Sequence, residues 1–300
     1  MPTVEPPALR KPPSGRAASR PPSTAFGTPR DFLGNRFVYA VVSPRARGLS
    51  LGVNLNPDKE CNFDCIYCEV DRHARCGAAQ LNVEVMAEEL SRTLGLVESG
   101  GLAQMPGFQG LPPDLLKLRQ VNLSGDGEPT LCPVFLDVVQ AVMHVRARSG
   151  LPFFKIVLIT NATGLDRPQV AEGIRSLTAR DEVWAKLDVG TQAWMERINR
   201  PAVLLDKVLA NILALARQRP VVIQSMFPLV NGQEPPEQEI REYALRLKEL
   251  KDAGANIPLV QIYSATRPTP HSECGHLPLR SLARIAQVVR DTSGLRAEVF

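Results

Sequence analysis

The chain has 300 residues, of which 44% are hydrophobic, and its formal net charge is +4. This length suffices to bury one large core, so we expect one main domain with small additions. No apolar run reaches the ~18 residues that a membrane span needs, and the N-terminus lacks the apolar stretch of a secretory signal. These features exclude a membrane partner and predict a soluble, cytoplasmic protein.

The excess positive charge lies in the first 30 residues, which hold five basic residues and one acidic residue. Residues 31–300 carry 30 charges of each sign, so the core charge does not support a nucleic-acid partner. Eight of the 26 prolines also fall in this first stretch. Residues 1–36 are therefore expected to form a disordered Pro/Arg-rich tail, with a partner-binding basic arm as the alternative.

From about residue 37, short apolar runs rich in β-branched residues alternate with segments of helical periodicity. The expected strands are 51–56, 120–124, 155–160, 183–188, 221–227 and 258–264. Two expected helices have apolar faces formed by Met86, Leu90, Leu94 and Val97, and by Leu204, Val208, Ile212 and Leu215. The alternation predicts an α/β fold with a parallel sheet, either an open or partial barrel or a doubly wound sheet.

Polar or Gly-rich residues follow several of these strands. In chain order they are the cysteine-rich segment from Cys61, the turn Gly125-Asp126-Gly127-Glu128-Pro129, Asn161, Lys186 with Asp188, and Ser264 to Arg267. Parallel α/β folds gather their functional groups at the carboxyl edge of the sheet. These residues are therefore expected to meet at one site.

The cysteine-rich segment has the spacing CxxxCxxC, formed by Cys61, Cys65 and Cys68. Thiolates at this spacing can converge on one soft metal centre, which suits an iron–sulfur cluster or zinc. A [4Fe–4S] cluster normally takes four cysteines, so three would leave one iron open to another ligand. A structural zinc site is the alternative, and it would recruit His73 or Cys76 as a fourth ligand.

With the aromatic Tyr67 just before its third cysteine, this segment resembles the signature of the radical S-adenosylmethionine (SAM) superfamily. The resemblance implies a partial (β/α)6 barrel in which the three cysteines bind three irons of a [4Fe–4S] cluster and SAM chelates the fourth. It also implies that SAM is cleaved reductively to a 5′-deoxyadenosyl radical, which abstracts a substrate hydrogen. Tyr67 would then lie near the adenine, and an electron donor such as flavodoxin or ferredoxin would be a partner.

The resemblance covers about residues 45–270. We accordingly expect the barrel domain to span residues 37–270, and residues 271–300 to form a C-terminal loop and helix packed on it. Cys132, Cys274, His271 and His276 do not form a convincing second cluster in the sequence, so one cluster is expected.

A second motif resembles the Gly-Gly-Glu-Pro turn that meets the SAM amino group in this superfamily. Here it reads Asp126-Gly127-Glu128-Pro129 after Gly125, with aspartate in place of the first glycine. Glycine allows a close approach of the backbone to a ligand, and Glu128 can accept a hydrogen bond from an ammonium group. Aspartate tolerates unusual backbone angles, so the turn is expected to survive the change.

Three further polar residues are expected near SAM. Lys186 and Asp188 lie two residues apart, on one face of the fourth predicted strand, and resemble polar residues that the superfamily uses near the SAM ribose or carboxylate. Asn161 would line the same cavity. For these residues, as for Gln224, Ser225 and Arg267, an ordinary structural role is the alternative.

The function predicted from the sequence is therefore that of a radical SAM oxidoreductase-like enzyme whose substrate is open. A small molecule, a tRNA nucleoside and a protein glycine are the substrate alternatives, suggested by a loose likeness to the wyosine-synthesis and glycyl-radical-activating branches. A non-enzymatic iron–sulfur or zinc-binding regulatory protein is the alternative from another class.

Overall fold

The computed structural model describes residues 25–26, 32–72, 80–267 and 269–300 of the chain. Of the predicted tail 1–36, the structure describes residues 25–26 and 32–36, among which Ala25, Phe32 and Asn35 are buried. The rest of the tail lies outside the described residues, and so do His73 and Cys76, the expected zinc ligands of the alternative site. The predicted tail and that alternative therefore stay predictions.

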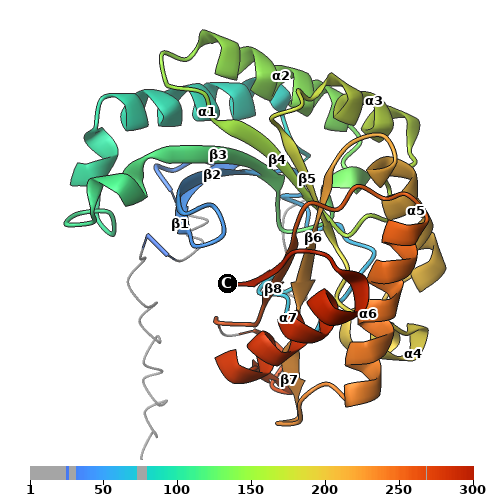
Figure 1. Ribbon diagram of the computed structural model, residues 1–300. Helices are drawn as coiled ribbons and strands as arrows, with labels where there is room; N and C mark the ends of the chain where they lie inside the picture. Colours follow the sequence, from blue (N-terminus) through green and yellow to red (C-terminus); the bar gives the residue numbers. More distant parts are fainter. Residues whose placement is uncertain (1–24, 27–31, 73–79, 268) are drawn as a thin grey trace, which may run out of the picture.

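One eight-stranded sheet forms the centre of the molecule, in the order β1-β2-β3-β4-β5-β6-β8-β10 (Figure 1). Its strands are β1 (Val38–Ser43), β2 (Gly48–Asn54), β3 (Leu118–Ser124), β4 (Lys155–Thr160), β5 (Glu182–Lys186), β6 (Val221–Met226), β8 (Val260–Tyr263) and β10 (Ala297–Val299). β1 pairs antiparallel with β2, and the other neighbours pair in parallel. The sheet is a curved, mostly parallel α/β sheet of the kind expected from the sequence.

Helices connect the parallel strands, as crossover connections require. They are α1 (Val83–Glu98), α2 (Phe135–Arg148), α3 (Pro168–Ser176), α4 (Gln192–Ile198), α5 (Leu205–Ala216), α6 (Glu237–Asp252) and α7 (Leu279–Ser293). Short 3₁₀ segments lie at Gly101–Gln104, Pro113–Leu116 and Pro129–Leu131, and β7 (Pro228–Val230) pairs with β9 (Cys274–His276) in a small separate sheet. Among the described residues, no helix is both long and apolar enough to cross a bilayer.

The two faces of the sheet differ in chemistry. The outer face contributes Leu51, Val121 and Ile156 to the main core, which also contains Met86 and Leu90 of α1. The register places a second set of side chains on the opposite, inner face, because successive residues of a strand alternate in direction. This inner face holds Ser50, Asn54, Gln120, Asn122, Ser124, Lys186, Gln224, Gln261 and Tyr263, with a small apolar cluster of Val157, Trp184 and Val222.

The turn between β1 and β2 reaches the opposite end of the sheet. Arg47 forms an ion pair with Glu298 of β10, with 3.6 Å between nitrogen and oxygen. The Arg45 guanidinium lies over the ring of Tyr263 at the end of β8, 4.4 Å from its centroid. The first hairpin and the last two strands of the sheet therefore approach each other, although β1 and β10 do not pair within the described residues.

The predicted strands agree with the structure to within about three residues, and 155–160 coincides with β4. The sequence did not indicate the edge strands β1 and β10, and the three-residue β10 pairs with β8. Leu204 is not part of the buried helical face: it is the N-cap of α5 and is 64% exposed, because the helix begins one residue later.

Asp181 generates a prediction about stability. Its buried carboxylate accepts two hydrogen bonds from Arg146, at 2.6 and 3.1 Å, and further bonds from the backbone of Ile156 and from Thr178. Burial alone would raise the pKa of this carboxyl, but these donors outweigh it and hold the pKa below its usual value. Asp181→Asn should cost about 3–5 kcal/mol in the free energy of unfolding, because Arg146 would keep a buried, unpaired charge.

The measurement is urea unfolding of the wild type and the variant between pH 7 and pH 3. A depressed pKa stabilises the fold above the unfolded pKa of about 3.9, so the difference between the proteins should shrink as the pH falls below that value. Asp252→Asn, which removes an exposed partner of Lys248, is the control and should change little. A pH-independent difference would contradict this account of Asp181.

Candidate functional site

The cysteine-rich loop follows β2 and is held in place by backbone hydrogen bonds to the segment after α4. Asp64 donates to the carbonyl of Asn199 and Ile66 to that of Ile198, both at 2.9 Å. Ala202 donates in turn to the carbonyl of Asn62, also at 2.9 Å. The loop is therefore fixed between the carboxyl ends of β2 and β5, which is where the sequence predicted the site.

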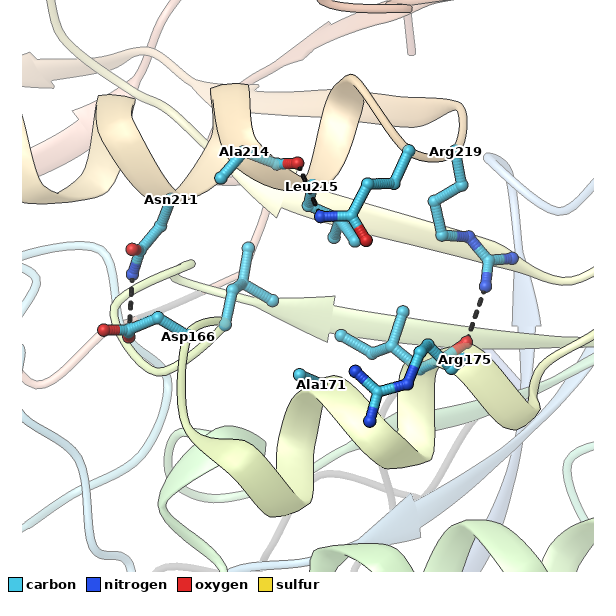
Figure 2. Close-up of a pocket in the computed structure, with 10 residues that line it drawn as sticks. Asp166, Ala171, Arg175, Asn211, Ala214, Leu215 and Arg219 are labelled. Carbon is cyan, nitrogen blue, oxygen red and sulfur yellow. Dashed lines mark hydrogen bonds between the residues drawn. The ribbon is translucent and has the colours of Figure 1, made fainter.

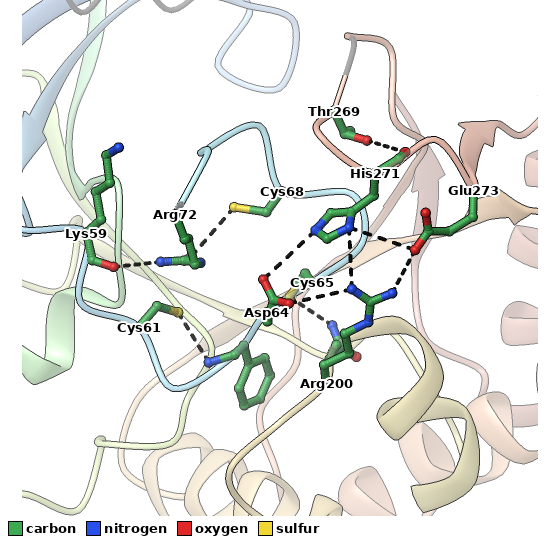
Figure 3. Close-up of polar contacts among 12 residues, drawn as sticks. Lys59, Cys61, Asp64, Cys65, Cys68, Arg72, Arg200, Thr269, His271 and Glu273 are labelled. Atoms are coloured by element: carbon green, nitrogen blue, oxygen red, sulfur yellow. Dashed lines mark hydrogen bonds and ion pairs between the residues drawn. The ribbon is translucent and has the colours of Figure 1, made fainter. Parts of the chain in front are cut away.

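Each of the three sulfur atoms has a nitrogen donor within hydrogen-bonding reach (Figure 3). The Phe63 backbone lies 3.5 Å from Cys61 Sγ, and the Arg72 guanidinium lies 3.6 Å from Cys68 Sγ. The Asn199 amide lies 3.4 Å from Cys65 Sγ. Such donors stabilise thiolates and are a known control on the potential of iron–sulfur clusters, so the donor set fits that group.

The three cysteines form no disulfide bonds, and the thiols of Cys61 and Cys65 are desolvated by burial. Burial raises the pKa of Cys61 to about 11 and that of Cys65 to about 12. Metal binding at this loop must therefore release protons. Among the residues that the structure describes, no three Cys, His, Asp or Glu side chains are already gathered in a geometry that could hold a metal ion.

Asp188 is the centre of a buried polar network beside Cys65. Its carboxylate accepts hydrogen bonds from the Tyr67 hydroxyl, from the Asn199 amide at 2.9 Å and from the backbone of Met226 at 2.8 Å. The Asn199 amide also lies 3.0 Å from the Tyr67 hydroxyl. This network connects the cysteine loop to the carboxyl ends of β5 and β6.

Lys186 extends this network across the inner face. Its ammonium lies 3.5 Å from Asp188 and donates to the Tyr263 hydroxyl at 3.2 Å, and it sits 4.9 Å from the centroid of the Tyr67 ring. Burial alone would lower the pKa of Lys186, but the nearby Asp188 carboxylate outweighs burial and raises it. The side chain therefore stays charged at neutral pH and cannot act as a neutral amine.

Glu128 anchors the turn Gly125–Pro129 and is only 3% exposed. One carboxylate oxygen accepts from the backbone and hydroxyl of Thr130 and from the hydroxyl of Thr160, and the other accepts from the backbone of Asn161 at 2.7 Å. Burial raises the pKa of this carboxyl, although these donors oppose the shift. The second oxygen accepts one bond, so one of its about two acceptor positions remains.

The same turn packs directly against the cysteine loop. The Glu128 backbone donates to the carbonyl of Glu60 at 2.9 Å. A Cβ atom at Gly127 would lie 1.9 Å from that carbonyl oxygen, and a Cβ at Gly125 would lie 2.4 Å from Asn54 Oδ1. Both glycines are therefore required by the close approach of the two segments.

Asp126 keeps the turn intact for a reason that differs from the expected one. None of residues 125–127 has a positive φ, so a tolerance for unusual angles is not needed. Instead, Asn54 at the end of β2 donates to the Asp126 carboxylate at 2.8 Å and accepts from the Asp126 backbone at 3.0 Å. Asp126, which stands where the motif it resembles has its first glycine, thus has a dedicated partner.

The remaining predicted residues take part in connections around the site. Asn161 donates to Asn62 of the cysteine loop at 2.8 Å and accepts from Thr163. Three other polar residues considered for the site also have partners. Gln224 donates a hydrogen bond to Gln261, the Ser225 hydroxyl bonds the Leu187 carbonyl and the Tyr243 hydroxyl, and Arg267 forms an ion pair with Glu69. The structure therefore brings Cys61, Cys65, Cys68, Tyr67, the turn, Asn161, Lys186 and Asp188 into one hydrogen-bonded region.

Sequence reasoning missed Asn199, Asn54 and Arg72. Asn199 follows α4 in the segment Arg197-Ile-Asn199-Arg-Pro201, and no spacing in the sequence relates it to the cysteines more than 130 residues earlier. Arg72 donates to the carbonyl of Lys59 at 2.7 Å and faces Cys68, but a lone arginine after a cysteine motif is not a distinctive signal.

A charged cluster covers the outer side of the cysteine loop, as Figure 3 shows. Arg200 forms ion pairs with Asp64 of the loop, at 3.5 Å, and with Glu273, at 2.7 Å. His271 lies 3.9 Å from Asp64 and 3.8 Å from Glu273. The cluster therefore connects the loop to the segment before α7.

A separate cavity of about 390 Å³ lies between α3 and α5 on the outer side of the sheet (Figure 2). It is bordered by Asp166, Arg175 and Arg219, among others. The Arg219 guanidinium is engaged by the carbonyls of Ile174, Thr178 and Asp181, and Asp166 by Lys207. Arg219 and Asp166 therefore join neighbouring elements, and no described residue of the cysteine site borders this cavity.

Asn199 generates a prediction for the metal-free protein. Replacing it with alanine removes donors from Asp188 and Tyr67, which stay buried, so the free energy of unfolding should fall by about 1–3 kcal/mol. Asn199→Asp should cost more, because it places a second carboxyl beside Asp188. Urea unfolding measures both, with the exposed Gln287→Ala as control. If both variants matched the wild type, the Asn199 network would not hold this site together.

Comparison with known proteins gives relatives and structural neighbours. No family model matches the chain. A "UPF0026 protein" of Helicobacter pylori (strain J99) is 24% identical over 269 residues, covering 84% of this chain and 79% of the relative. A "UPF0026 protein" of Methanocaldococcus jannaschii is 30% identical over 179 residues, covering 59% and 48%. These identities indicate distant relatives, and their names state no activity.

Three solved structures share the fold. The structure titled "TYW1 with a lysine-pyruvate adduct bound" has a TM-score of 0.55 at 14% identity, covering 86% of this chain and 85% of that one. Streptococcus suis SuiB bound to S-adenosylmethionine has a TM-score of 0.56 at 15% identity, covering 81% and 48%. A radical SAM methyltransferase from Sphaerobacter thermophilus has a TM-score of 0.60 at 14% identity, covering 88% and 68%. The resemblance predicted from the two motifs is therefore confirmed at the level of the fold: the chain has the fold of the radical SAM enzymes.

Proposed function

We propose that this protein is a radical SAM enzyme whose site is the carboxyl edge of the sheet between the cysteine loop and the turn Gly125–Pro129. The observation that carries the proposal is the direct docking of these two motifs, through the hydrogen bond from the Glu128 backbone to the Glu60 carbonyl next to Cys61. The two bonded residues, Glu60 and Glu128, lie 68 positions apart in the sequence, and an unrelated metal-binding loop would not need this turn beside it.

In this proposal Cys61, Cys65 and Cys68 hold three irons of a [4Fe–4S] cluster, and SAM completes the fourth. When bound, the cluster and SAM supply a 5′-deoxyadenosyl radical that abstracts a hydrogen atom from the substrate. The protein's own contribution is placement. The backbone bonds to the segment after α4 fix the loop, and the donors at the three sulfur atoms stabilise the thiolate form.

The residues proposed to bind SAM surround this loop. Gly125, Asp126, Gly127 and Glu128 present backbone groups and one remaining carboxylate acceptor to the amino group. Tyr67, Lys186 and Asp188 offer an aromatic ring, a cation and a carboxylate for the adenine, carboxylate and ribose. Asn161 acts mainly by holding the cysteine loop through Asn62. The SAM complex of SuiB supports SAM as the ligand of this fold.

For the substrate, three classes stay open within the proposal. The TYW1 and SuiB structures contain a lysine-pyruvate adduct and, in another complex of SuiB, a precursor peptide, and these belong to those proteins. The balanced charge of residues 31–300 favours a small molecule over a tRNA nucleoside, because phosphate contacts need clustered Lys and Arg. An electron donor such as flavodoxin or ferredoxin, in the cytoplasm, completes the proposed reaction.

The decisive experiment is anaerobic reconstitution with iron and sulfide, followed by dithionite and SAM. Formation of 5′-deoxyadenosine and methionine is expected. A non-enzymatic iron–sulfur or zinc-binding regulator would bind metal at the same cysteines without cleaving SAM, so protein with a full complement of metal and no 5′-deoxyadenosine would overturn the proposal.

Removal of one thiol tests the metal centre. Cys65→Ala should abolish cluster assembly, because two cysteines cannot hold the cluster. Iron analysis and the visible absorption of the sulfur-to-iron charge-transfer bands measure the cluster content. Cys274→Ala is the matched control, because Cys274 lies in β9 outside the loop. Full iron content in the Cys65 variant would remove this residue from the centre.

Glu128→Gln tests the turn. The Glu128 carboxylate now accepts four hydrogen bonds, and in the variant the amide NH₂ group would face one or more of these donors. The turn should therefore lose hydrogen bonds and be held less firmly. We expect SAM affinity to fall about tenfold or more while the cluster still assembles. Equilibrium dialysis with reconstituted protein measures the affinity, and Glu60→Gln, which removes an exposed charge beside the same turn, should bind SAM normally. Unchanged affinity in Glu128→Gln would exclude this residue from the SAM site.

A further inference from the structure

The cavity between α3 and α5 has a size and a lining that suit a small molecule (Figure 2). Its volume of about 390 Å³ lies within the range of about 300–1,000 Å³ that is common for small-molecule sites. Its apolar walls are formed by Leu165, Ala171, Ile174, Ala214 and Leu215. Such walls favour a ligand with an apolar body, because binding removes the apolar surface of that body from water.

The two ends of the cavity are fixed by a side chain of α5 and by one that follows this helix, as Figure 2 shows. Asn211 lies at one end and donates to the carbonyls of Ala162 and Thr163, at 2.8 and 3.0 Å. Arg219 lies at the other end and is bonded to three backbone carbonyls. A preformed cavity loses little conformational entropy when a ligand binds, so its contacts count toward affinity.

Arg219 keeps N–H groups that no described residue uses. Backbone carbonyls take three of the about five N–H donors of its guanidinium, and its Nε atom is buried with no hydrogen-bond partner among the described residues. Burial lowers the pKa of Arg219, although the nearby Asp181 carboxylate opposes the shift. That carboxylate takes its hydrogen bonds from other residues. An unpaired donor on a buried charged group costs free energy, which a bound acceptor would recover.

Arg175 adds a second cation at the same end of the cavity. It follows Ile174, whose carbonyl bonds the Arg219 guanidinium at 2.8 Å, and no carboxylate pairs with Arg175 in the part of the chain that the structure describes. The acidic residue that borders the cavity, Asp166, is already paired with Lys207 at 2.6 Å. The unmatched charge of the lining is therefore positive, and the complementary ligand is an anion.

We propose that the cavity between α3 and α5 is a binding site for a small carboxylic acid with an apolar body. The carboxylate accepts from Arg219 Nε and pairs with Arg175, while the apolar body lies along Ala171, Ala214 and Leu215. A carboxylate suits the few available donors better than a phosphate, whose three oxygens need more partners. None of the described residues that border the cavity belongs to the cysteine loop, so this site does not depend on the proposed function.

The test uses the full-length protein and isothermal titration calorimetry with matched probes. Hexanoate has both the carboxylate and the apolar body, acetate has the carboxylate alone, and hexanol has the body alone. We expect saturable binding of hexanoate, and binding about tenfold weaker or more for acetate, hexanol and inorganic phosphate. The proposal is overturned if hexanoate does not bind, or if acetate, hexanol or phosphate binds as tightly as hexanoate does.

Two variants and a control locate the bound probe. Arg175→Gln, at an exposed position, should weaken hexanoate binding about tenfold. Ala214→Leu places a larger side chain in the wall of the cavity, so binding should be lost although both arginines remain. Arg241→Gln removes an exposed arginine of α6 that does not border the cavity, and it should bind hexanoate as the wild type does. Wild-type affinity in either cavity variant would overturn the proposal.

Arg219→Lys tests the buried donor, because it keeps the charge and removes Nε. Hexanoate affinity should fall about tenfold or more. Circular dichroism checks the fold of this variant, since Arg219 also joins α3 to the segment after α5, and Arg175→Gln with Ala214→Leu decides the outcome if it does not fold. SAM affinity of reconstituted Arg175→Gln should equal that of the wild type. A loss of SAM affinity would assign Arg175 to the cofactor and overturn the separate site.

Discussion

The hydrogen bond between the Glu128 backbone and the Glu60 carbonyl is the contact on which the site depends, because it docks two motifs from different βα units. The contact is possible only because Gly127 lacks a side chain: a Cβ there would overlap the Glu60 carbonyl. Glu128 then holds the turn from the other side through Thr130, Thr160 and Asn161. The buried Glu128 carboxylate thus positions the segment that lies next to Cys61. It does so through residues that follow β3 and that end β4.

A second buried carboxylate organises the other side of the cysteine loop. The Asp188 carboxylate accepts hydrogen bonds from Tyr67, Asn199 and the backbone of Met226, and it forms an ion pair with Lys186. The Asn199 amide also lies within hydrogen-bonding reach of Cys65 Sγ. Buried charges are tolerated only when they are fully hydrogen-bonded, so each member of such a network constrains the others. The cysteine loop is therefore held between Glu128 and Asp188, which follow β3 and β5, two strands separated by β4.

The sequence predicted the elements that depend on local pattern. The run 155–160 forms a strand as predicted, and the carboxyl ends of the parallel strands meet at one edge, so Glu128, Asn161 and Asp188 lie near the cysteine loop, as the sequence predicted. Residues whose role comes from tertiary contacts were not found. Asn199 contacts Cys65 because the segment after α4 forms backbone hydrogen bonds with the cysteine loop. Asp126 is stabilised by a hydrogen bond from the Asn54 side chain, which no rule about backbone conformation predicts. β10 was missed because a strand of three residues carries little periodic signal.

The two faces of the sheet differ in how well the sequence predicts them. The outer face follows the hydrophobic pattern, because crossover helices such as α1 and α5 cover it, and that pattern is readable in the sequence. The inner face breaks the pattern with Ser50, Gln120, Gln224 and Gln261, which a sequence reading takes for ordinary alternation of polar and apolar residues. Alternation normally means that one face is exposed to solvent. Here the sheet curves and the β1–β2 turn approaches β8 and β10, so the polar face is enclosed. The fold therefore buries polar side chains on a face that the hydrophobic pattern alone would assign to solvent.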